Sequence, residues 1–153
     1  MRHLAELNVA VPRFALDDPR MAPFMDNLVR INGLAARMPG FVWMHRDDTG
    51  HAMHQPTPWS GMAANLSVWE TPRDLEHFVH QTVHKRFMAR RAEWFEAMRS
   101  RHFVMWWVDA GHRPDLGEAK ARLDHLEAHG DTDHAFTWSH LPQAGTLEAQ
   151  RCG

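Results

Sequence analysis

Two stretches of the chain have the pattern of β-strands whose two faces differ. In residues 3–11 and 63–70, every second residue is small or aliphatic, which is the period expected of a strand. The apolar faces of these two strands comprise Ala5, Leu7 and Val9, and Ala64, Leu66 and Val68. The opposite faces comprise Leu4, Glu6 and Asn8, and Asn65, Ser67 and Trp69. Residues 41–46 predict a further short strand, and the nearly continuous apolar run 102–108 predicts a strand in the centre of a sheet.

Apolar residues at steps of three and four predict helices between these strands. The first helix begins after Asp17-Asp18-Pro19 and stops at Pro39-Gly40. The second begins at Thr71-Pro72, but its apolar side changes to the opposite side of the helix near Thr82-Val83. We therefore expect a break there, followed by a second helical segment over about 84–98. A third helix covers about 116–126 and ends at Gly130.

The order of these elements predicts an α+β fold, namely the ferredoxin-like β-α-β-β-α-β arrangement with an extra C-terminal helix. We expect one domain over 1–130 and an irregular tail over 131–153 that covers a sheet edge or frays. Helices cover one face of the sheet. The other face, with Leu7 and Leu66, would expose an apolar patch, so we expect a second copy to pack there, giving a homodimeric α+β barrel.

Composition excludes several classes of partner. The 153 residues include 17 basic and 19 acidic side chains, which argues against binding nucleic acid or an anionic membrane surface. No apolar run approaches the length of a membrane span, and the start of the chain lacks the apolar core of a signal peptide. The single cysteine, Cys152, permits no disulfide within the chain. We expect a cytoplasmic protein.

The thirteen histidines suggest a metal site, but their positions do not support one. His77 and His80 lie opposite the apolar side of their helix and should face solvent. His51 and His54, in the polar loop 47–61, have no identifiable third ligand. The histidines near the end of the last helix suit the negative end of its dipole. We therefore predict no metal site.

His84 differs from the other histidines because it lies on an apolar helix face, seven residues before Arg91. A polar side chain in such a place usually has a partner. One interpretation is a core histidine bonded to a strand carbonyl. The others are a general base, a hydrogen-bond partner of a substrate or an axial haem ligand, in a cleft between helix and sheet. Phe87 and Met88 lie on the same part of the helix and would line this cleft.

The polar strand faces suggest the floor of that cleft. Asn8, Asn65, Ser67 and Trp69 occupy positions where Val or Leu would pack better, which predicts a pocket with placed polar groups; a half-exposed face is the alternative. Glu6 shares this face and would act as a base or pair with Arg91. Trp106 and Trp107 point to opposite faces, and we assign Trp106 to the pocket. The predicted catalytic residues are His84, Asn8, Trp69 and Glu6. The predicted substrate-binding residues are Asn65, Ser67, Phe87, Met88, Arg91 and Trp106.

Several segments resemble a bacterial family, domain of unknown function 3291. They are LAELNVA (4–10), LDDPRM (16–21), PGFVW (39–43), NLSVWE (65–70), the span 84–95 and WWVDAGHRP (106–114). The resemblance covers about 3–138 and implies the dimeric α+β barrel superfamily. Small monooxygenases of that superfamily, haem-degrading or quinone-forming, place an Asn on the first strand and a Trp at the end of the third. The haem-degrading ones add a His on the next helix, and Asn8, Trp69 and His84 occupy similar places.

These observations leave three functions open. The leading hypothesis is a monooxygenase-like oxidoreductase without a cofactor, acting on a small aromatic or polyketide-like substrate. The second is a haem-binding protein or haem-dependent enzyme with His84 as axial ligand. The third is a dimer that binds a small ligand without catalysis, so the sequence does not decide whether the protein is an enzyme.

Overall fold

The computed structural model describes residues 1–46 and 62–141. The predicted loop with His51 and His54, and the tail beyond residue 141, lie outside the described residues. The described strands are β1 (Arg2–Pro12), β2 (Phe41–Met44), β3 (Ala63–Trp69), β4 (Phe95–Glu96) and β5 (Phe103–Asp109). The described helices are η1 (Pro19–Met21), α1 (Ala22–Arg37), α2 (Pro72–Val79), α3 (Thr82–Ala89), α4 (Arg91–Trp94), α5 (Leu116–His129) and η2 (Trp138–His140).

The strands form one antiparallel sheet. β3 and β5 flank β1 along most of its length, β2 lies outside β3, and the two residues of β4 pair with the end of β1. The order β2-β3-β1-β5 is the ferredoxin-like arrangement and confirms the predicted fold class. The central position predicted for the last strand is wrong, because β5 pairs with β1 on one side and meets only an isolated bridge, Met105 to Phe136, on the other. β5 is apolar instead because other parts of the chain cover both of its faces.

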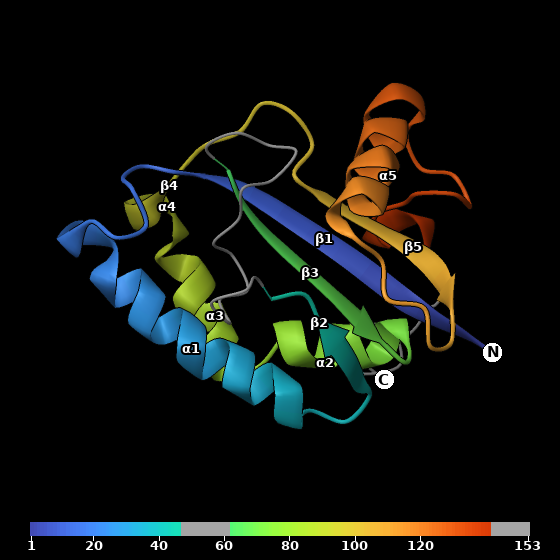
Figure 1. Ribbon diagram of the computed structural model, residues 1–153, viewed down its shortest axis with the longest axis horizontal. Coiled ribbons are helices and arrows are strands. Elements are labelled where there is room, and N and C mark those ends of the chain that lie inside the picture. The colour runs from blue at the N-terminus through green and yellow to red at the C-terminus, as the bar shows by residue number, and fades with distance from the viewer. Residues whose placement is uncertain (47–61, 142–153) are drawn as a thin grey trace, which may run out of the picture.

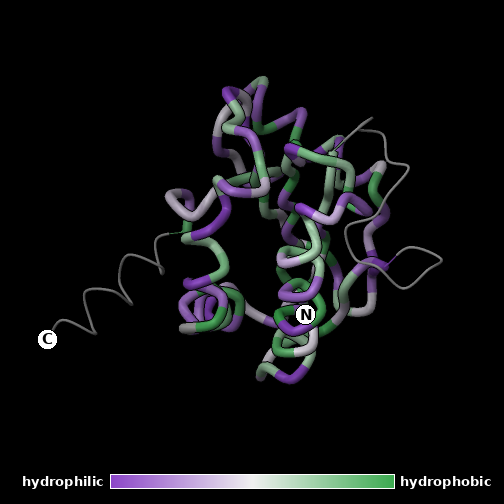
Figure 2. The backbone as a smooth tube through the Cα atoms, turned by 90° about the vertical axis from the view of Figure 1, so that its left-hand side faces the viewer, coloured by the Kyte–Doolittle hydropathy of each residue, from purple (hydrophilic) through white to green (hydrophobic). Residues whose placement is uncertain are grey.

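The helices lie on both faces of the sheet, with α1 to α4 on one side and α5 on the other (Figure 1). Their caps agree with the sequence: Thr71 Oγ1 accepts a hydrogen bond from the backbone N–H of Asp74 at the start of α2, and Asp115 does the same for Glu118 in α5. Figure 2 shows hydrophilic and hydrophobic residues following each other along the coiled segments, as expected of helices with one buried face. No helix in the described part of the chain is long and apolar enough to cross a membrane.

The predicted helix break is confirmed, but the segment after it is shorter than expected. α2 ends at Val79 and α3 begins at Thr82, so the axis changes within three residues of the predicted place. α3 ends at Ala89 rather than near residue 98, and Phe95–Glu96 is a short strand paired with β1. The apolar residues Trp94 and Phe95, which suggested a continuing helix, instead pack in the core beside Phe24 of α1.

α5 covers the sheet face that we expected a second copy to cover. Ala119, Leu123 and Leu126 of α5 pack against the apolar face of the strands, whose members Ala5, Leu7, Val9, Leu66 and Val68 are at most 1% exposed. The reason given for a homodimer is therefore wrong, because this surface is already buried within one chain. The homodimer itself stays a prediction.

The described part of the tail covers the free edge of β5. Phe136 exchanges two backbone hydrogen bonds with Met105, of 2.8 and 2.9 Å, and is fully buried. This bridge covers the edge of β5 at Met105, where the strand would otherwise present unpaired backbone groups.

Candidate functional site

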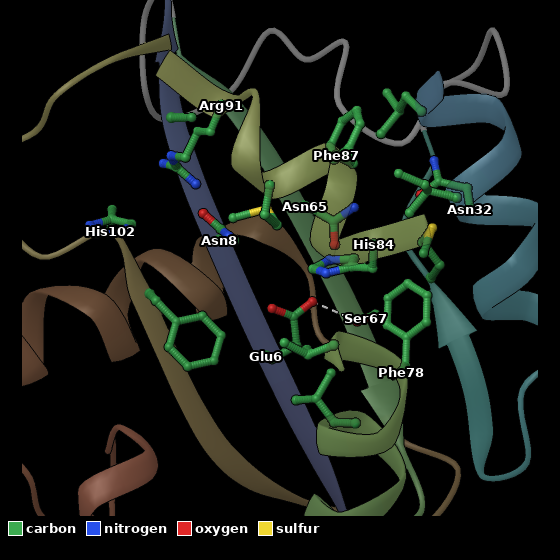
Figure 3. A pocket seen from close by; sticks show the side chains of 18 of the residues that line it. Glu6, Asn8, Asn32, Asn65, Ser67, Phe78, His84, Phe87, Arg91 and His102 are labelled. Carbon is green, nitrogen blue, oxygen red and sulfur yellow. Dashed lines mark hydrogen bonds between the residues drawn. The ribbon is translucent and has the colours of Figure 1, made fainter. Parts of the chain in front are cut away.

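A cavity of about 380 Å³ lies between the sheet and the helices α1 to α4 (Figure 3). This volume is in the range of small-molecule sites, which are mostly apolar with a few placed polar groups. Its apolar lining comes from all four helices as well as from the strands. The aromatic members of that lining are Phe24, Trp69, Phe78, Phe87, Trp94, Phe95, Phe103 and Trp138.

The floor of the cavity consists of two polar pairs on neighbouring strands. In the antiparallel register of β1 and β3, Glu6 lies opposite Ser67 and Asn8 lies opposite Asn65. Side chains directly opposite each other on one face of such a pair are neighbours. All four line the cavity, together with Trp69, so the structure places these predicted site residues in one pocket.

Glu6 is the most perturbed acid of the site. Its side chain is buried, with 7% of the residue exposed, and burial raises its pKa from 4.5 to about 7. The Ser67 hydroxyl donates a hydrogen bond of 2.6 Å to Glu6 Oε1, which opposes part of this rise. The Trp69 indole N–H donates to Ser67 Oγ at 3.0 Å. The three residues thus form a chain of donors that ends on the carboxyl group and fixes its orientation.

Trp69 is also held by aromatic contacts. It stacks on Phe78 of α2, with ring centroids 5.3 Å apart and planes inclined by 22°, and it meets Phe41 of β2 edge-on. These contacts fix the indole ring between the floor and the α2 wall. The orientation of Ser67, and through it that of Glu6, is fixed by the same packing.

His84 lies at the start of α3 and points toward Glu6 across the cavity in Figure 3. Its ring meets Phe78 at 5.0 Å, and burial lowers its pKa, an effect that the Val79 backbone only partly opposes. Its Nδ1 atom is buried and forms no well-aligned hydrogen bond with any described residue. A core histidine would bond a strand carbonyl, and the described residues show no such hydrogen bond to this atom. The helix break between α2 and α3 is what turns this side chain into the cavity.

The residues of α3 and α4 line the upper wall. Phe87, Met88 and Arg91 border the cavity as predicted. The predicted pairing of Arg91 with Glu6 is wrong, because the described partner of the Glu6 carboxyl group is Ser67. Arg91 is partly buried and lies 5.8 Å from the Phe95 ring.

Trp106 does not line the cavity, so its predicted place is wrong. Its side chain is on the α5 face of the sheet, fully buried, and its indole N–H donates to Glu118 Oε2 at 2.9 Å. Trp107 packs with the residues of the opposite face, against Phe136. The two tryptophans do point to opposite faces, as expected, but the assignment was reversed because neighbouring apolar residues give no sign of which face is which.

Sequence reasoning missed several residues of the cavity. Asn32 on α1 and His102, just before β5, are its additional polar members. Asn32 follows Leu28 by four residues, so its place on the buried face of α1 was readable from the spacing. His102 had no such signal, because its place depends on the pairing of β5 with β1.

The histidine pairs are on the surface of the described structure. His77 and His80 are exposed, as predicted. His125 lies 4.5 Å from His129 and 4.6 Å from His134, measured between ring centroids. Within residues 1–46 and 62–141, no three His, Cys, Asp or Glu side chains are placed to hold one metal ion.

Comparison with known proteins identifies the family. The sequence profile of the domain of unknown function DUF3291 matches residues 3–152. The chain belongs to the DUF3291 family. This confirms the resemblance noted in the sequence. No curated protein matches this member of DUF3291 with significance.

Solved structures of low sequence identity share the fold of this DUF3291 protein. A conserved protein from Methanosarcina mazei is 9% identical, with a TM-score of 0.51 over 71% of this chain and 93% of its own. A protein from Nitrosomonas europaea, provisionally assigned as an antibiotic biosynthesis monooxygenase, is 10% identical, with a TM-score of 0.50 over 74% of this chain and 94% of its own. Both show the α+β fold alone. A cofactor-independent oxygenase from Streptomyces nogalater scores 0.49 at 14% identity, over 74% of this chain and 97% of its own.

Proposed function

We propose that this protein is an enzyme that removes a proton from a small aromatic or polyketide-like substrate, whose anion then reacts with molecular oxygen. The observation that carries the proposal is Glu6, a buried carboxyl group that faces an apolar cavity and has a pKa of about 7. Strongly perturbed acids in a cleft are typical of catalytic sites. The monooxygenase-like fold is compatible with this reaction but does not by itself assign it.

Glu6 has the properties of a general base. A group with a pKa near the working pH combines a useful fraction of the ionised form with a basicity higher than that of an ordinary carboxylate. Ser67 binds Oε1, so that Oε2 is left without a described partner to approach the substrate. Truncating such a base typically slows a reaction about 10²–10⁴-fold.

The walls and floor fit a flat substrate that becomes an anion. Trp69, Phe78 and Phe87 offer aromatic surfaces against which a ring system can pack. Asn8 and Asn65 form the next pair on the same face, two residues along from Glu6, and their amide N–H groups can donate to an oxygen on which charge develops. We infer that these two residues orient the substrate and stabilise its enolate or phenolate.

The reaction balances without an added reductant. An activated CH₂ group loses a proton to Glu6, and the delocalised carbanion gives its electrons to O₂ as a carbon–oxygen bond forms. The resulting hydroperoxide loses water to leave a ketone, so that CH₂ and O₂ yield C=O and H₂O. The peroxide anion recovers the proton from Glu6, and Glu6 then takes the second C–H proton and passes it to the departing hydroxide. His84 faces the same space and can accept a hydrogen bond from the hydroperoxide.

Oxygen consumption tests the proposal. The protein is mixed with a tricyclic aromatic ketone that has an acidic CH₂ group, in buffer with chelator, and O₂ uptake and ketone formation are followed together. We expect one O₂ per ketone and a loss of at least about 100-fold in Glu6→Gln. Glu76→Gln is the matched control, since Glu76 is also a buried glutamate but does not line the cavity. Equal rates for wild type and Glu6→Gln would overturn the proposal.

Haem binding is the second candidate, and His84 is the observation that favours it. The Nδ1 atom of His84 is buried and forms no well-aligned hydrogen bond with any described residue. Burial also favours the neutral form of the imidazole, which is the form that coordinates haem iron. A Soret band that appears on haem titration and is lost in His84→Ala would favour this function. Binding of aromatic compounds without turnover would instead indicate a non-catalytic ligand-binding protein. The homodimer and the cytoplasmic location stay predictions, and light scattering of the purified protein tests the first.

A further inference from the structure

Arg91 brings a positive charge to the cavity that no described carboxylate neutralises. It is partly buried, and burial alone lowers its pKa. The neighbouring Arg90 is exposed and bonds Glu93 at 2.7 Å, so the nearby acid is already occupied by another arginine. Removing a charge from water without a partner is costly. Such a group in the wall of a ligand-sized cavity is typical of a binding site for an anion.

The surroundings of Arg91 are neutral hydrogen-bonding groups. Burial lowers the pKa of His102, and the charge of the nearby Arg91 lowers it further. Asn8 and Asn65 form a polar pair of the floor, and all four side chains line the same cavity. In Figure 3, Arg91, His102 and Asn8 lie at one end, whereas Glu6 and Ser67 lie further along the sheet.

The strand geometry separates the two ends of the cavity. Glu6 and Asn8 are on the same face of β1, two residues apart, which corresponds to about 7 Å. The backbone N–H of Val9 bonds the His102 carbonyl at 2.9 Å, so His102 is anchored beyond Asn8 as seen from Glu6. An anion held at Arg91 would therefore be separated from a group held at Glu6 by about the width of a small ring system.

We propose that the cavity takes an aromatic carboxylate, whose carboxylate group is bound by Arg91 while its reactive end lies at Glu6. The part concerning Glu6 rests on the proposed function; the carboxylate site does not. A single guanidinium binds a carboxylate through two parallel N–H groups and neutralises it. A phosphate dianion would leave excess negative charge in an apolar space that already contains Glu6.

Binding of matched probes tests this site. Trp69, Trp94 and Trp138 line the cavity, so bound aromatic compounds should change the tryptophan fluorescence. The probes are 2-naphthoate and its neutral amide, 2-naphthamide, which have nearly the same shape. We expect wild type to bind the carboxylate at least about tenfold more tightly than the amide, a preference that decreases with added salt.

Variants of the two adjacent arginines provide the control. Arg91→Gln should bind both probes equally, Arg91→Lys should recover part of the preference, and Arg90→Gln should keep all of it. Circular dichroism and thermal midpoints check that each variant is folded. The proposal is overturned if wild type shows no preference for the carboxylate, if neither probe binds at millimolar concentration, or if folded Arg91→Gln keeps the preference.

The oxygenation assay separates this inference from the proposed function. A carboxylate preference that depends on Arg91, without oxygen consumption, supports the anion site and refutes the oxygenase. Oxygen consumption that depends on Glu6, without a carboxylate preference, supports the oxygenase and refutes the anion site. Glu6→Gln should bind 2-naphthoate at least as well as wild type, because it removes a negative charge from the same cavity.

Discussion

The buried carboxyl group of Glu6 allows a quantitative prediction of how the free energy of unfolding depends on pH. The perturbation is Glu6→Gln, which keeps the shape of the side chain and its ability to accept from Ser67 but cannot ionise. Because the pKa is about 7 in the folded protein and 4.5 as the ordinary value, the folded state holds the proton more tightly than the unfolded state. Wild type therefore loses stability as the pH rises from about 4.5 through about 7, whereas the variant lacks this contribution.

The size of the effect follows from the two pKa values. A tenfold change in proton affinity corresponds to about 1.4 kcal/mol, so the rise from 4.5 to about 7 corresponds to about 3 kcal/mol. The free energy of unfolding of Glu6→Gln, minus that of wild type, should therefore increase by about 3 kcal/mol between pH 4 and pH 8.5. Taking this difference cancels the titration of groups common to both proteins.

Urea denaturation at half-unit steps of pH measures the difference directly. Ser67→Ala is a useful companion, because it removes a hydrogen bond that lowers the Glu6 pKa and should extend the loss of stability to higher pH. A difference between Glu6→Gln and wild type that stays constant over this pH range would refute the reasoning. Burial would then not destabilise the ionised form, and Glu6 would lack the basicity on which the proposed function depends.

Three further predictions concern other parts of the structure. Trp106→Phe removes the hydrogen bond to Glu118 and should cost about 1 kcal/mol in urea denaturation, with naphthoate binding unchanged because Trp106 is on the other face. Leu126→Ala creates a cavity under α5 and should cost about 2–5 kcal/mol; a cost below 0.5 kcal/mol would contradict the packing of α5 on the sheet. His84→Ala should reduce turnover in the oxygen assay while the stability changes by less than about 1 kcal/mol, and unfolding of this variant would instead show a structural role.

Much of the site was predictable because strand alternation is a local property. The period of two placed Glu6 and Asn8 on one face of β1, and Asn65, Ser67 and Trp69 on one face of β3. The helix break was predictable for a similar reason, since one straight helix cannot bury two opposite faces. It was this break that singled out His84.

The partners of these residues were not predictable, because they depend on the register between strands. The pairing of Glu6 with Ser67 follows from a register that joins positions 61 residues apart, and neither strand alone encodes it. The same is true of the place of His102 at the cavity and of the assignment of Trp106 to the α5 face. In each case a short apolar or polar segment is compatible with more than one neighbour.

The sequence by itself determined the order of the elements, the two faces of the main strands and the polar groups that one of them presents. Local chemistry suffices for these, since caps, breaks and periodicity act within a few residues. Only the tertiary structure decided that α5 buries the second face, that Glu6 is enclosed enough to have a pKa of about 7, and that the predicted site residue Arg91 has no described counterion. Burial and desolvation depend on everything packed around a group, and that environment comes from distant parts of the chain.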